Sequence, residues 1–92
     1  MEVVVLKNIK MNINDLQSKF PALLFKSMGS LSKYPSSSHY HISSTEYKNS
    51  GIVEVTFFKD NGNSSVEIKL ASNRVGTWGQ KGFALIKETF SK

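Results

Sequence analysis

A hairpin signal around Asn61-Gly62 constrains this 92-residue chain more than any other feature of its sequence. Alternating apolar and polar residues flank the dipeptide, and Asn-Gly tolerates the two positive φ values of a type I′ turn. With Asn61-Gly62 at the centre, the apolar residues pair on one face of the hairpin: Val53 with Leu70, Val55 with Ile68, and Phe57 with Val66. Glu54 then lies opposite Lys69 on the other face, and a shift of one residue would destroy both matches.

Two further segments are predicted to be strands. Residues 39–45 are rich in β-branched and aromatic side chains, and the turn-like residues 46–51 join them to the hairpin as a three-stranded meander. Residues 3–6 form a continuous apolar run, which is typical of a strand covered on both faces or of a short edge strand under a helix. The sequence leaves open which strand this segment pairs with.

An apolar stripe with helical spacing lies between these strands. It covers roughly a third of a helical wheel and consists of Ile13, Leu16, Phe20, Leu23, Leu24, Met28 and Leu31. Asn12, three residues before an aspartate, or Asn14, three residues before a glutamine, would cap its N-terminus. Pro21 lacks an N–H group and disfavours helical geometry at the preceding residue. The helix is therefore predicted to kink at Pro21 or, as the favoured alternative, to break there into two short helices.

A last helix is predicted from Phe83, Ile86 and Phe90, which share one stripe. The glycine-rich residues 74–82 before it are predicted to form a loop that extends into the first helical turn. The element order is β-α-β-β-β-α, within a single domain of residues 1–92. We therefore expect an α+β, two-layer fold, in which both helices pack on one face of an antiparallel sheet made of the meander and the N-terminal strand.

Composition limits the functions that remain. Without cysteine, the chain cannot form a disulfide scaffold, a thiolate zinc site or a cysteine nucleophile. No apolar run reaches the ~18 residues that cross a membrane, and Glu2 is unlike the basic start of a signal peptide. A cytoplasmic location and no membrane partner are expected. The net charge of +5, from eleven lysines and one arginine against seven acids, favours an anionic partner.

The preferred function is a small, basic, non-enzymatic module that binds nucleic acid, and its first candidate contact surface is a lysine ridge. Lys19, Lys26 and Lys33 recur every seven residues and would lie within about 40° of one another on one continuous helix. The alternative is that the three lysines only form the solvated face of an amphipathic helix, where lysines are common. With a single arginine in the chain, binding is expected to depend on phosphates and shape, with weak sequence specificity.

The second candidate surface for nucleic acid is the glycine-rich loop that contains Arg74, Trp78 and Lys81. Glycines expose backbone N–H groups, a helix N-terminus follows, and the two cations would attract phosphate. The indole would be available to stack on a base. The alternative is that Trp78 caps the core.

A protein-binding or self-associating module, such as a small inhibitor or assembly factor, is the alternative function. Phe58 lies on the hairpin face opposite the core, beside Thr56 and across from Ser65, where a large apolar group needs a cover. A base, the N-terminal segment or a second protomer could provide that cover. In the last case the sheets of a homodimer would pair across a two-fold axis.

His39 and His41 are the candidate catalytic pair. They stand two residues apart, so a strand would project both from one face toward a metal or a phosphate. No acid is placed at a recognisable ligand spacing, so no metal or cofactor is predicted and the two histidines are expected to face solvent. His41-Ile42-Ser43 resembles one half of the signature of two-histidine phosphoesterases, but the second half is absent. A small nuclease or phosphodiesterase using both histidines is the third hypothesis.

Overall fold

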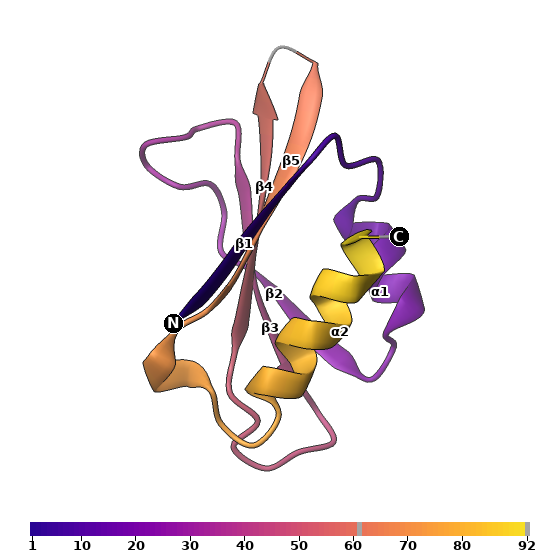
Figure 1. Ribbon diagram of the computed structural model, residues 1–92, viewed down its shortest axis with the longest axis vertical. Helices are drawn as coiled ribbons and strands as arrows, with labels where there is room; N and C mark the ends of the chain where they lie inside the picture. Colours follow the sequence, from indigo (N-terminus) through magenta and orange to yellow (C-terminus); the bar gives the residue numbers. More distant parts are fainter. Residues whose placement is uncertain (61, 92) are drawn as a thin grey trace.

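An antiparallel sheet with helices on one side organises the computed structural model, which describes residues 1–60 and 62–91 (Figure 1). The elements are β1 (Glu2–Lys7), α1 (Ile13–Lys19), β2 (Leu23–Ser27), β3 (Ser38–Ser44), β4 (Val53–Asp60), β5 (Asn63–Leu70), the 3₁₀ turn η1 (Ser72–Arg74) and α2 (Gly79–Ser91). The five strands are ordered β1-β5-β4-β3-β2. The predicted α+β class and element order are confirmed, with one strand more than expected.

The central hairpin has the predicted register. Val55 pairs with Ile68, Phe57 with Val66, and Glu54 with Lys69. Gly62 has a φ of 81°, a conformation that glycine adopts without strain. The predicted turn also includes Asn61, which lies outside the described residues.

Helix α1 is shorter than the predicted apolar stripe. It begins with the first of the two expected caps: the backbone N–H of Asp15 donates to Oδ1 of Asn12 at 3.0 Å, and the Asn12 N–H donates back to the Asp15 carboxylate at 2.9 Å. The helix ends at Lys19. Pro21 follows in a turn that the Leu23 N–H closes on the carbonyl of Phe20.

The prediction that residues 23–31 continue as a helix is wrong. Residues 23–27 form β2, which pairs with β3. Leu23 and Phe25 face the core while Leu24 is exposed, so the segment follows the two-residue period of a strand. A short apolar run fits both the helical period and the two-residue period of a strand. The turn at Pro21 selects the strand, because it directs the chain back along the sheet.

The core lies between the sheet and the two helices. Its fully buried centre includes Val55, Ile68 and Ile86, and the predicted stripe of α2 packs against it. Strand β1 pairs with β5 at one edge of the sheet, which answers the question of its neighbour. Val4 and Leu6 of β1 pack against the core, and Val3, Val5 and Lys7 turn to the opposite side of the sheet.

Both α1 and α2 lie on one side of the sheet, and the opposite side, here called the open face, carries no helix among the described residues (Figure 1). The loop of residues 28–37 lies on this side, at one end of the strands. From the strand registers, the side chains of the open face are Val3, Val5 and Lys7 of β1, Ser65, Glu67 and Lys69 of β5, Glu54, Thr56 and Phe58 of β4, His39, His41 and Ser43 of β3, and Leu24 and Lys26 of β2.

Candidate histidine and glutamate site

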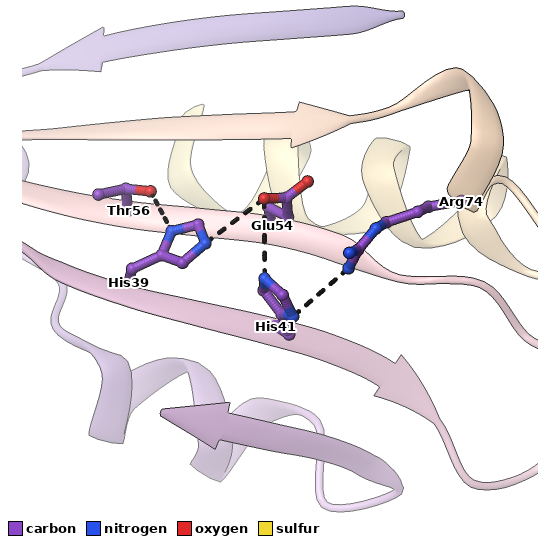
Figure 2. Close-up of polar contacts among 5 residues, drawn as sticks. All are labelled: His39, His41, Glu54, Thr56 and Arg74. Carbon is purple, nitrogen blue, oxygen red and sulfur yellow. Dashed lines mark hydrogen bonds and ion pairs between the residues drawn. The ribbon is translucent and has the colours of Figure 1, made fainter. Parts of the chain in front are cut away.

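His39, His41 and Glu54 form a cluster on the open face (Figure 2). His41 lies directly opposite Glu54 on the neighbouring strand, and His39, two residues earlier on β3, projects to the same side. Nε2 of His39 is 3.4 Å from Oε1 of Glu54, and Nε2 of His41 is 3.7 Å from the same oxygen. One carboxylate oxygen is therefore shared by the only two imidazoles of the chain.

Two neighbouring side chains contact Nδ1 of these rings, the nitrogen that faces away from Glu54. Oγ1 of Thr56, a residue only 2% exposed, lies 2.7 Å from Nδ1 of His39. Nη1 of Arg74 lies 3.5 Å from Nδ1 of His41, which is the long limit of a hydrogen bond. A guanidinium can only donate, so Nδ1 of His41 is the acceptor and the proton of this ring lies on Nε2, facing Glu54.

The surroundings of His41 favour its neutral form. Partial burial removes water from the charged imidazolium and lowers the pKa of His41 from its ordinary value of 6.5. The carboxylate of Glu54 acts in the opposite direction, while His39, Arg74 and Lys26 lower the pKa further. The ring of His41 is therefore mainly neutral at neutral pH.

The free energy of unfolding of the protein should decrease as the pH falls below about 6.5. In the unfolded chain His41 takes up a proton at its ordinary pKa, whereas the folded protein resists that proton until a lower pH. Thermal unfolding in the presence of EDTA at pH 7.5, 6.5 and 5.5 measures this loss. The melting temperature of His41→Gln should depend less on pH than that of the wild type. If the melting temperatures of the two proteins depend equally on pH, His41 is not the group that causes the loss of stability.

The predicted lysine ridge does not form. Lys19 ends α1, Lys26 lies on the open face in β2, and Lys33 lies in the tight turn between Leu31 and Tyr34. The ridge required one continuous helix from Lys19 to Lys33, whereas α1 ends at Lys19 and the turn at Pro21 follows.

The second predicted group is also separated by the fold. Trp78 is buried in the core at 3% exposure, so its indole is not available for stacking and the alternative reading of this residue holds. Arg74 points toward His41 on the open face (Figure 2). Lys81 lies 3.4 Å from the hydroxyl of Tyr47 and lines a shallow groove of about 260 Å³ together with Lys19.

The predicted protein interface around Phe58 is partly covered. The ring of Tyr34, from the loop of residues 28–37, stands edge-on to Phe58 with centroids 5.3 Å apart. Thr56 is buried and contacts His39, while Ser65 is half-buried. Part of the cover that Phe58 needs therefore comes from this loop.

Sequence reasoning missed Glu54 as a partner of the histidines and expected both rings to face solvent. The two side chains are in fact only 15% and 17% exposed. The missing information was the register of β3 on β4, because Glu54 is directly opposite His41 only in that register. The available signal was the position of Glu54 on the side of the hairpin away from the core, where a neighbouring strand would present the histidines.

No protein-family model, curated protein or solved structure matches this chain. Neither helix in the described residues is both long enough and apolar enough to cross a membrane. The function must therefore be inferred from the residues of the open face.

Proposed function

We propose that the protein binds single-stranded nucleic acid on the open face of its sheet. The observation that carries this proposal is that neither α1 nor α2 covers this face, which combines cations with an exposed aromatic ring. Lys26 and Lys69 lie in one row across the strands, on either side of the pair formed by His41 and Glu54. Arg74 reaches the same row from η1.

The loop of residues 28–37 supplies the aromatic part of this surface. Tyr34 is 54% exposed, and its contact with Phe58 ties the loop to the open face. Sheet surfaces with aromatic rings and cations bind single strands, because bases stack on the rings while phosphates contact the cations. Tyr34 thus replaces the buried Trp78 as the candidate stacking residue.

Lys26→Glu should weaken binding of a labelled single-stranded oligonucleotide by about tenfold or more at ~50 mM salt, because it replaces one phosphate contact by a repulsive charge. Fluorescence anisotropy at about 50 and about 200 mM salt measures the affinity and its salt dependence. The slope of log affinity against log salt should become shallower by about one. Wild-type protein should prefer single strands to duplex DNA and duplex RNA.

The matched control is Lys87→Glu, which changes the net charge equally on an exposed position of α2 away from the open face. It should retain most of the wild-type affinity. If both variants lose the same affinity, binding reflects net charge and not the open face. If wild-type protein binds none of the three nucleic acids at low salt, the proposed function is wrong.

Self-association is the second candidate function for the open face. The supporting observation is that Val3 and Val5 are 47% and 53% exposed there on the edge strand β1. An apolar contact between two copies should persist at high salt, whereas phosphate-led binding should weaken. Analytical ultracentrifugation at both salt concentrations distinguishes the two, and Val5→Asp should dissociate a dimer formed through this face.

A further inference from the structure

We propose that His39, His41 and Glu54 bind a divalent transition-metal ion of the zinc type. Each of the three residues offers a ligand atom, and these atoms lie within 4.8 Å of one another. Two histidines and one carboxylate are a known ligand set of catalytic zinc sites, and imidazole favours such ions over calcium or magnesium. This proposal does not depend on nucleic-acid binding.

The distances suit a tetrahedral coordination shell. Bonds of about 2.0–2.1 Å to zinc place neighbouring ligand atoms roughly 3.3–3.5 Å apart. Oε1 of Glu54 lies 3.4 Å from Nε2 of His39 and 3.7 Å from Nε2 of His41. Both imidazoles aim the same nitrogen at this oxygen (Figure 2). Small side-chain rotations would therefore let one ion replace the contacts among the three groups.

Thr56 supports the ligand role of His39. When Nε2 of a histidine binds a metal, Nδ1 carries the ring proton and can donate it. In His39 that nitrogen is 2.7 Å from the buried Oγ1 of Thr56. An outer hydrogen bond of this kind orients a ligating histidine and holds the required tautomer.

Arg74 has the opposite effect on His41. Metal binding through Nε2 would leave the proton on Nδ1 of His41, where it would face the N–H groups of Arg74. The positive charge of the guanidinium would also repel the ion. Arg74 therefore has to move aside when the metal binds, and we expect it to reduce the affinity of the site.

Three protein ligands leave one tetrahedral position for water or an anionic oxygen. The side chains of the three ligands are 15–17% exposed, so the cluster is reached from the open face. A bound ion would present positive charge at the centre of the row that runs from Lys26 to Lys69.

The test is titration of tag-free, chelator-treated protein with CoCl₂, followed by visible absorption, and with ZnCl₂, followed by calorimetry. One ion per chain is expected, and zinc should displace the cobalt signal. Glu54→Gln should weaken binding by at least about 100-fold, since loss of an outer-shell partner alone costs about 10–100-fold. The matched control is Glu67→Gln, which removes the same charge opposite Thr56 on the same face and should change the affinity by less than about threefold.

Arg74→Gln supplies the most specific test, because a purely structural role for the cluster predicts no gain in affinity for zinc. Its affinity for zinc should rise by about tenfold as the guanidinium charge is removed. Circular dichroism establishes that each variant is folded, and His39→Gln replaces Glu54→Gln if that variant unfolds. The proposal is overturned if the wild type binds no stoichiometric metal, if Glu54→Gln and Glu67→Gln bind equally, or if Arg74→Gln binds more weakly.

Discussion

Replacing Gly51 by alanine should destabilise the protein by about 4 kcal/mol and lower its melting temperature by about 20 °C. Gly51 has a φ of 86°, and an added Cβ would collide with the backbone carbonyl oxygens of Arg74 and Val75. Backbone cannot yield as the end of a flexible side chain does, so the loop before β4 and the segment after β5 would have to separate.

The energy estimate follows from the contacts between these two segments. The N–H groups of Ile52, Thr77 and Trp78 donate to the carbonyls of Arg74, Asn49 and Ser50, each at 2.9 Å. Each hydrogen bond contributes about 1 kcal/mol net, and the left-handed backbone at residue 51 costs a further ~1 kcal/mol for alanine. Thermal unfolding followed by circular dichroism measures the total loss of stability.

Gly29→Ala is the matched control for this substitution. Gly29 has a φ of 79°, nearly that of Gly51, but an added Cβ would meet nothing within 4 Å. Only the backbone cost of about 1 kcal/mol should remain. If the two variants lose the same stability, the close approach of the two loops has no energetic importance.

Gly82→Ala should destabilise the protein by about 2 kcal/mol, although alanine is the better helix former. The helix-propensity gain is about 1 kcal/mol. Against it, the new Cβ would lie 2.5, 2.6 and 2.7 Å from three ring carbons of Trp78. Overpacking of this kind costs about 1–3 kcal/mol or more, and the upper end applies because the indole is buried and cannot move into solvent. Urea unfolding gives the free energy.

A double variant tests the assigned cause. Trp78→Leu removes the ring that the new methyl group would meet, so Gly82→Ala should cost much less in that background than in the wild type. Gln80→Ala, at an exposed position of the same helix, should change stability by no more than about 0.5 kcal/mol. A Gly82→Ala protein as stable as the wild type would show that α2 shifts freely on the sheet.

The sequence was most informative where structure is decided locally. The hairpin register follows from a two-residue turn and the alternation on both sides of it, so the pairs between β4 and β5 were predicted correctly. The same holds for the stripe of Phe83, Ile86 and Phe90. Residues 23–27 lacked such a signal, because a short apolar run fits a helix and a strand alike and tertiary pairing with β3 decides between them.

The candidate site depends on geometry that no periodic pattern records. Glu54 meets the histidines because the connection from β3 to β4 turns through Asn49 and Gly51, both with positive φ. Arg74 reaches His41 because its carbonyl is held by the N–H of Ile52. The positions of Glu54 and Arg74 both depend on the close approach of the loop before β4 to the segment after β5. Neither position leaves a spacing in the sequence that resembles a metal motif.

The pairing of β1 with β5 has a consequence for the order in which the chain folds. Glu2 pairs with Leu70, so β1 cannot take its place in the sheet until β5 has been synthesised. Strands β2 to β5 each pair with their neighbour in the sequence and can assemble earlier. During this interval the free edge of β5 is an unprotected template for pairing with another chain. The addition of β1 covers the edge of β5 and leaves β1 itself as the edge of the sheet.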